Sequence, residues 1–317
     1  MAILNMTDQM TALEIVRRAN APDPFKIIEL MGLTNEMLLD VPAYEANNGV
    51  RNISLQRNIK PMGTHRIYHQ GVGKVATQTK PVEDRIAMMA EYSDVDARLL
   101  AHSGNIKAAR MSEAIAIIKG MGLTQAQTLI YGDGSKPEEF AGLMERYNSF
   151  ADVVNAGGTG SNLTSIYICA VGPVLFHLIY PKGSTSVGVS REDRGLIDAK
   201  DSDGNEYPAY RDYFSAEYGL TIKDPKAVRR IANIRANMSG DDLVDLILET
   251  KAKMPQGAAS YVMYSNADIL IKLDKAGRDR TNVVHSATDP WGKPITMVRD
   301  IRCRRMDVIL NTESAVA

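Results

Sequence analysis

The clearest pattern along the chain is a series of apolar residues between Lys107 and Tyr131 that recur at three- and four-residue intervals. They are Ala108, Met111, Ile115, Ile118, Leu123, Ala126, Leu129 and Ile130. This spacing puts apolar side chains on one face of a helix, about 40 Å long at 1.5 Å per residue. Gly132 and Gly134 predict where the helix ends. Gly120 and Gly122 lie inside it, where each costs about 1 kcal/mol relative to Ala.

A different pattern covers residues 51–82, which are polar, extended and free of Asp and Glu. Two extended runs, 52–68 and 75–82, flank Gly71 and Gly73, and glycine permits the positive φ of a tight turn. The pattern predicts a long β-hairpin with six basic residues: Arg51, Arg57, Lys60, Arg66, Lys74 and Lys80. Because a hairpin with few large apolar residues is marginally stable alone, we expect a neighbouring chain to stabilise it.

Residues 149–278 alternate between strand-like and helix-like patterns. Apolar runs at 165–171 and 174–180 predict strands, and Asp203-Gly204 predicts a hairpin turn. Asp224-Pro225 predicts the start of a helix that runs to about Met238. Further helices are predicted over 241–253 and 265–275, and the tail over 296–311 alternates like a strand. Residues 1–49 contain only short helical pieces, which predict an arm that lies on another surface.

The charge is balanced overall but uneven along the chain. Lys plus Arg number 37 and Asp plus Glu number 38, and aromatic residues make up 6%. A dedicated nucleic-acid binder usually has a basic excess, so this balance argues against one. Residues 191–224 carry nine acidic and five basic residues. The basic hairpin therefore has two interpretations, contact with phosphates or with an acidic surface of a sister subunit, and the second is favoured because both signs occur in one chain.

The search for catalytic and binding motifs predicts neither an enzyme, a cofactor site nor a metal site. The segment from Gly71 to Ala76 formally fits a dinucleotide-binding pattern, but the residues after it do not predict a helix. His65 and His69 have no nearby carboxylate, so a solvated hairpin face is the favoured interpretation. The two cysteines do not form a C-x-x-C motif, and no segment reads as a signal peptide or membrane span. We therefore expect a soluble protein made in a reducing cytoplasm.

In the order of these parts and in several short sequence motifs, the chain resembles the major capsid proteins of tailed phages with the Hong Kong 97-type fold. The motifs resemble those of a short-tailed phage family. They are Tyr131-Gly-Asp-Gly-Ser-Lys-Pro-Glu-Glu-Phe-Ala-Gly-Leu143, Arg146-Tyr-Asn148, Ser165-Ile-Tyr-Ile168, Ile179-Tyr-Pro-Lys-Gly183, Tyr210-Arg-Asp-Tyr213, Arg230-Ile-Ala-Asn233 and Met306-Asp-Val-Ile-Leu-Asn-Thr-Glu313. No single motif is diagnostic. The resemblance rests on the order and spacing of the motifs, from about residue 25 to the end.

This resemblance implies an α+β chain in four parts. Residues 1–49 would form an N-terminal arm, and residues 50–86 an extended loop that reaches over a neighbouring subunit. Residues 87–148 and 279–317 would form a peripheral domain built on the spine helix at about 107–131. Residues 149–278 would form an axial domain that meets its copies at fivefold and sixfold centres.

The implied function is a major capsid protein that assembles as pentamers and hexamers into the icosahedral shell around a double-stranded DNA genome. Its partners would be its own copies, a scaffolding protein, a portal and a decoration protein, with no membrane. It would be located in the virion after synthesis in the bacterial cytoplasm. The alternatives are the shell of an encapsulin-like nanocompartment, an α/β enzyme and a nucleic-acid-binding module.

The candidate functional residues are of two kinds. The six basic residues of the hairpin are candidates for intersubunit contact. Gly120 and Gly122 are candidates for a hinge that lets the spine helix bend in an immature shell and straighten later. The alternative, held equally, is that these glycines only allow a strand to pack closely against the helix.

Overall fold

The computed structural model describes ten ranges of the chain: 35–57, 62–74, 79–102, 106–150, 152–184, 187–200, 204–257, 260–279, 287–288 and 294–316. Strands and helices occur in runs along them, such as β1 to β3, α4 to α6 and β4 to β8, as is typical of an α+β chain. Among these residues, twelve strands join in one sheet, whose main path runs β13-β14-β10-β5-β6-β8-β3-β2. β1 pairs with β6, β7 with β8, and β9 with both β4 and β5.

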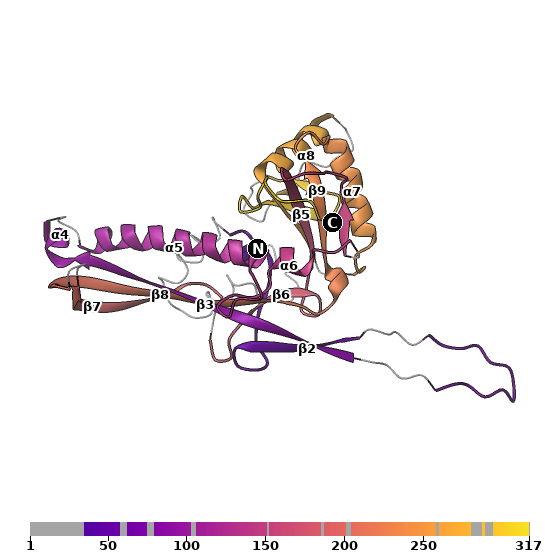
Figure 1. Cartoon of the computed structure of the whole chain (residues 1–317), viewed down its shortest axis with the longest axis horizontal. Helices are drawn as coiled ribbons and strands as arrows, with labels where there is room; N and C mark the ends of the chain where they lie inside the picture. The colour runs from indigo at the N-terminus through magenta and orange to yellow at the C-terminus, as the bar shows by residue number, and fades with distance from the viewer. Residues whose placement is uncertain are drawn as a thin grey trace, which may run out of the picture.

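One half of the molecule is an elongated unit, called the leaf below. It consists of the strands and helices within residues 86–131 and 190–222. β3 (Thr79–Asp96) and β8 (Glu206–Ile222) pair antiparallel over eleven positions, from Ile86↔Gly219 to Asp96↔Ala209. β7 (Ser190–Lys200) forms a hairpin with β8. The helix α5 (Ile106–Tyr131) runs alongside β3 and β8, and α4 (Ala97–His102) precedes it. Figure 1 shows these elements extending together to one side of the molecule.

The hairpin of β2 (Arg51–Arg57) and the first part of β3 projects to the opposite side (Figure 1). The pairing runs from Arg51↔Arg85 to Arg57↔Thr79, which confirms an antiparallel hairpin at its base. Beyond that base, the described residues 62–74 form turns and open loop without a strand ladder. The hairpin therefore has a paired base and an unpaired far end.

A compact unit stands above the centre of the molecule in Figure 1. Its sheet consists of β4 (Val153–Asn155), β5 (Leu163–Val171), β9 (Val228–Arg235), β10 (Ser260–Ser265), β13 (Met297–Val298) and β14 (Ile301–Arg305). α7 (Gly240–Ala252) and α8 (Ala267–Asp279) pack against each other on it. Every residue of β5 is buried, as a central strand with apolar side chains on both faces requires.

Short elements join the two halves. They are α3 (Met37–Asp40), β1 (Ala43–Glu45), α6 (Leu143–Arg146), β6 (Phe176–Tyr180) and the 3₁₀ turn η1 (Pro225–Ala227), whereas β11 (Ala287–Thr288) and β12 (Pro294–Ile295) form a separate two-stranded sheet. β6 pairs with β8 of the leaf and with β5 of the compact unit. One apolar core runs through both halves, from Ile118 and Leu129 on α5 to Leu243 on α7 and Ile301 on β14.

Several predicted elements are confirmed. The long helix begins at Ile106 and ends at Tyr131, against a prediction of 107–131. The strands at β5 and β6, the hairpin before Gly204 and the helices α7 and α8 lie where the sequence predicted them. Most of the predicted N-terminal arm lies outside the described residues. The tail is a strand only in part, since β14 ends at Arg305.

The predicted helix from Pro225 to about Met238 is wrong. Only η1 is helical, and residues 228–235 form the strand β9. Val228, Ile231 and Ile234 lie three residues apart, which fits a helix, but β9 is buried between β4 and β5. Packing on both sides of a central strand overrides that local spacing.

Strand pairing crosses the predicted domain boundaries. β8 belongs to the predicted axial segment 149–278, yet it pairs with β3 along the long leaf. β14 belongs to the predicted peripheral segment 279–317, yet it pairs in parallel with β10 of the compact unit. These pairings connect residues far apart in the sequence, so the order of parts along the chain did not indicate them.

Candidate assembly surfaces and the buried network at the C-terminal segment

The basic residues of the hairpin are not equivalent in the structure. The guanidinium of Arg51 lies 2.6 Å from Glu83 on the partner strand, so this residue is paired within its own chain. Arg66, Lys74 and Lys80 are exposed along the hairpin. Lys60 and the side chain of Arg57 lie outside the described residues. The hairpin therefore presents at least three exposed cations.

The unpaired end of the hairpin also exposes large apolar side chains, which sequence reasoning missed because it treated this segment as polar. Tyr68 is 96% exposed, Met62 88%, Ile67 75% and Val72 51%. A turn holds two of them outward, since the Gln70 amide donates to the Ile67 carbonyl at 3.2 Å. Large exposed apolar side chains grouped on one segment are typical of an interaction surface. The signal was present in the sequence as four apolar residues within eleven.

Gly120 and Gly122 both lie in α5 but in different surroundings. Gly120 is exposed, and a Cβ atom at this position would meet no atom within 4 Å. Gly122 is buried. Close packing therefore does not explain Gly120, and this alternative now applies to Gly122 alone.

The acidic region of the leaf is partly neutralised by the chain itself. Arg110 on α5 donates to Asp193 at 2.6 Å and to Asp212 at 2.8 Å, and Arg191 donates to Asp212 at 3.0 Å. The Asp212 side chain is only 4% exposed. These bonds tie the start of α5 to β7 and β8, so Asp193 and Asp212 serve the fold of this chain.

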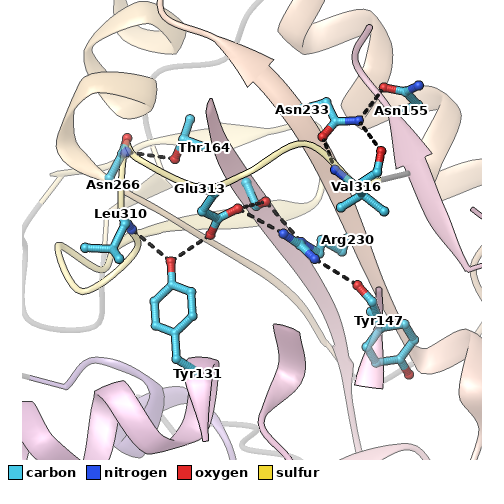
Figure 2. A network of polar contacts seen from close by, with 11 residues as sticks. Tyr131, Tyr147, Asn155, Thr164, Arg230, Asn233, Asn266, Leu310, Glu313 and Val316 are labelled. Carbon is cyan, nitrogen blue, oxygen red and sulfur yellow. Dashed lines mark hydrogen bonds and ion pairs between the residues drawn. The ribbon is translucent and has the colours of Figure 1, made fainter. Parts of the chain in front are cut away.

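A buried polar network fixes the C-terminal segment to the compact unit (Figure 2). Arg230 on β9 donates to Glu313 at 2.9 Å, to the Ser165 hydroxyl at 3.0 Å and to the Tyr147 carbonyl at 3.0 Å. Ser165 makes a short contact with the same carboxylate. A buried charge is tolerated when it is paired and hydrogen-bonded, and each of the three guanidinium nitrogens of this arginine donates a hydrogen bond.

The network extends to the end of the long helix. The Tyr131 hydroxyl donates to Glu313 at 2.7 Å and accepts the Leu310 amide at 2.9 Å. Burial first, and then the charge of Glu313, raise the pKa of Tyr131 above its usual range, so the hydroxyl keeps its proton. One carboxylate thereby links α5, β5, β9 and the C-terminal segment.

Two asparagines complete the attachment. Asn233 accepts the Val316 amide at 2.9 Å and donates to Asn155 at 3.0 Å. Its φ of 62° lies in the left-handed region, which asparagine tolerates better than most residues. Asn266 donates to Thr164 on β5 at 3.0 Å and to the side-chain oxygen of Asn311 in the C-terminal segment. Nothing in the sequence pattern indicated this network, because its members lie up to 182 residues apart.

The residues considered for other chemistry form no such arrangement. In the described ranges there is no group of three or more His, Cys, Asp or Glu that could hold a metal ion. His65 and His69 are exposed on the hairpin. Cys169 and Cys303 are buried free thiols, and burial raises the pKa of both. No helix within the described residues is long and apolar enough to cross a membrane.

Comparison with known proteins gives these features a context. The chain resembles one in a structure of bacteriophage Epsilon15, with 30% identity, a TM-score of 0.69, and coverage of 100% of this chain and 99% of that one. It also resembles the bacteriophage JBD30 capsid, with 9% identity, a TM-score of 0.54 and coverage of 87% and 91%. These likenesses identify the fold as the phage capsid fold of the Hong Kong 97 type. The family described as major capsid protein GP7 matches residues 20–317, and the chain belongs to this family.

Two further comparisons are less informative. No curated protein sequence matches the chain. The SrpI encapsulin of Synechococcus elongatus has 12% identity, a TM-score of 0.45 and coverage of 64% of this chain and 88% of that one. A likeness this small carries no argument for a nanocompartment. The chain is thus a phage major capsid protein, a component of the virion.

Proposed function

We propose that copies of this chain assemble as pentamers and hexamers into an icosahedral shell that encloses a double-stranded DNA genome. The observation that carries the proposal is the match to an Epsilon15 chain over the whole length of both. A closed shell built from one sequence needs contacts that repeat with small changes in geometry. The projecting hairpin supports this, because its unpaired end can adapt to more than one neighbour.

The hairpin contributes to these contacts in two ways. Tyr68, Ile67 and Met62 provide apolar area that becomes buried against a neighbouring subunit. Arg57, Lys60, Arg66, Lys74 and Lys80 add charge complementarity to acidic surface on that neighbour. Arg51 contributes little to the contact because Glu83 already pairs with it.

The strand pairing supports a revised domain division. The peripheral domain consists of α5 with β3, β7 and β8, and the axial domain consists of β4, β5, β9, β10 and β14 with α7 and α8. The C-terminal segment then belongs to the axial domain, to which the Arg230–Glu313 pair attaches it. The axial domains surround the fivefold and sixfold centres, as the sequence resemblance implied.

The chain acts as a structural component and not as an enzyme. A scaffolding protein, a portal and a decoration protein are its expected partners in the virion, and the shell contains DNA without reading its sequence. Synthesis takes place in the cytoplasm of the bacterial host. The encapsulin-like alternative differs in one measurable respect, since such cages enclose enzyme cargo and no genome.

Electron microscopy of the purified protein tests the proposal, with icosahedral shells or separate pentamers and hexamers as the expected result. A protein that remains monomeric at all concentrations and salt conditions would contradict it. Neutralising Arg57, Lys60 and Arg66 to Gln should reduce the yield of shells. The matched control replaces Lys119, Lys182 and Lys200, three exposed lysines outside the hairpin, with Gln. Equal yields from both variants would exclude the role of the hairpin charges.

A further inference from the structure

A basic pocket lies in the compact unit where β4, η1, the start of β9 and the end of α7 meet. Its volume is about 390 Å³, and its walls are formed by Phe150, Asp152, Val153, Val154, Lys226, Arg229 and Lys253. Three cations face one carboxylate, so the lining has a net charge of +2. Figure 1 shows α7 on the outer side of this unit, away from α5.

The cations of the pocket are only partly satisfied within the chain. Arg229 donates to the Asp152 carbonyl at 3.3 Å and lies 3.8 Å from its carboxylate, while its Nε atom is buried without a hydrogen-bond partner. Lys226 and Lys253 are exposed, and neither side chain forms an ion pair with the described residues. Phe150 is 46% exposed beside them. The pocket therefore combines unpaired positive charge with an exposed aromatic ring.

The outer face of α7 has the opposite charge. Asp242, Asp245 and Glu249 follow each other at three- and four-residue spacing, all exposed, and no Lys or Arg occurs in residues 240–250. We call these three residues the acidic stripe. Leu248, beside the stripe, is 36% exposed.

Asp242 lies in the first turn of α7 and accepts the Ser239 hydroxyl at 2.7 Å, but the other two carboxylates of the stripe are unfavourable for the isolated chain. Asp245 and Glu249 are four residues apart, where like charges destabilise a helix. Glu249 also lies in the last turn, where the helix dipole disfavours negative charge. Neither carboxylate has an ion-pair partner within the described residues. Lys253, four residues after Glu249 at the end of α7, lies toward the same face but forms no ion pair with it, so cations of a second chain would add to the relief of both effects.

We propose that the basic pocket of one subunit receives the acidic stripe of α7 from a second copy of this chain. The pairing rests on the proposed function, because a ring of identical subunits needs two different, complementary surfaces on each copy. Lys226, Arg229 and Lys253 meet Asp242, Asp245 and Glu249, and Phe150 packs near Leu248. The contact recurs around each pentamer and hexamer. It sets which face of one subunit meets which face of the next.

A charge-exchange experiment tests this pairing. Lys226→Glu with Lys253→Glu, and separately Asp245→Lys with Glu249→Lys, should each lower the fraction of protein in shells about tenfold, as unpaired like charges repel across a contact. The four substitutions together restore opposite charges and should return the fraction to within about threefold of the wild type. Sedimentation and electron microscopy measure the fraction in shells, and thermal unfolding verifies that each variant is folded. Lys182→Glu with Lys200→Glu is the control with the same change in charge.

Different outcomes overturn different statements. Normal assembly of both reversed variants, or no rescue in the four-substitution variant, would overturn the pairing while leaving the capsid function intact. Loss of salt-dependent DNA binding in the Lys226→Glu, Lys253→Glu variant, with normal assembly, would assign the pocket to phosphate groups instead. A wild-type protein that forms no shells or capsomers would contradict the proposed function itself.

Discussion

Arg230 and Glu313 form an ion pair with almost no access to solvent, although 83 residues separate them in the sequence. The Nη2 and Oε2 atoms are 2.9 Å apart, and the two side chains are 0% and 2% exposed. Arg230 comes from the centre of a buried strand, whereas Glu313 comes from a segment with little secondary structure of its own. The pair therefore defines where the C-terminal segment lies, by giving its only acidic side chain beyond Asp307 a buried partner.

Removing one member of this pair should destabilise the protein strongly. Arg230→Met leaves the Glu313 carboxylate buried without its cation, and breaking a buried pair in this way costs about 3–5 kcal/mol. The midpoint of urea unfolding, followed by circular dichroism, measures the loss in unfolding free energy.

The matched control is the double variant Arg230→Met with Glu313→Leu. It removes both charges and should recover most of the lost stability, because no uncompensated charge remains. Should the double variant be as unstable as the single one, the pair would owe its effect to packing and not to charge.

Tyr131→Phe should have a smaller effect on the same network. The variant keeps the ring but removes the hydroxyl, which leaves the Leu310 amide and one oxygen of Glu313 without this partner. An unsatisfied buried group, here the Glu313 oxygen, costs about 1–3 kcal/mol of unfolding free energy, whereas the amide of the half-exposed Leu310 can bind water. Tyr92→Phe, at a tyrosine that is 54% exposed, serves as the control and should change stability very little. Equal unfolding midpoints for both variants would show that the hydroxyl is dispensable.

The sequence predicted the elements whose pattern is local. The apolar spacing of residues 107–131 determined α5 to within one residue, because a long helix repeats its signal over seven turns. The hairpin was predicted from glycines between two polar runs, and its paired base is confirmed. In both cases the residues that create the signal also create the structure.

The elements that depend on distant partners were not predictable in this way. β9 has a helical spacing of apolar residues, and only its position between β4 and β5 makes it a strand. Likewise, nothing in the sequence near Glu313 indicates that its carboxylate is buried, because its partner Arg230 is 83 residues away. The pairing of β8 with β3 and of β14 with β10 was not predictable for the same reason, since these partners are far apart in the sequence.

His177 should make stability depend on pH in a mildly acidic range. Burial first, and then the charge of Lys223, lower the pKa of His177 from 6.5 to about 4. The unfolded chain therefore binds a proton between these values that the folded chain does not. Stability from this source is complete above pH 6.5 and decreases as the pH falls to 4, by about 3 kcal/mol in all.

The measurement compares the wild type with His177→Gln at several pH values between 7 and 4. The gap in unfolding free energy between the two proteins should shrink as the pH falls, because only the wild type loses the histidine contribution. A constant gap for His177→Gln would mean that the pKa of this imidazole is the same in the folded and the unfolded chain.

Gly120→Ala should stabilise the long helix, in contrast to most substitutions in a folded protein. The added Cβ meets no atom within 4 Å, and alanine is favoured over glycine inside a helix by about 1 kcal/mol. Gly142→Ala is the opposite control, because its Cβ would lie 2.6 Å from the Gly132 amide nitrogen and 2.7 Å from the Ile130 carbonyl oxygen. If α5 bends at this glycine in an immature shell, Gly120→Ala with Gly122→Ala should also slow shell expansion, measured as the change in shell diameter over time. Normal expansion of the double variant would show that the glycines are not a hinge.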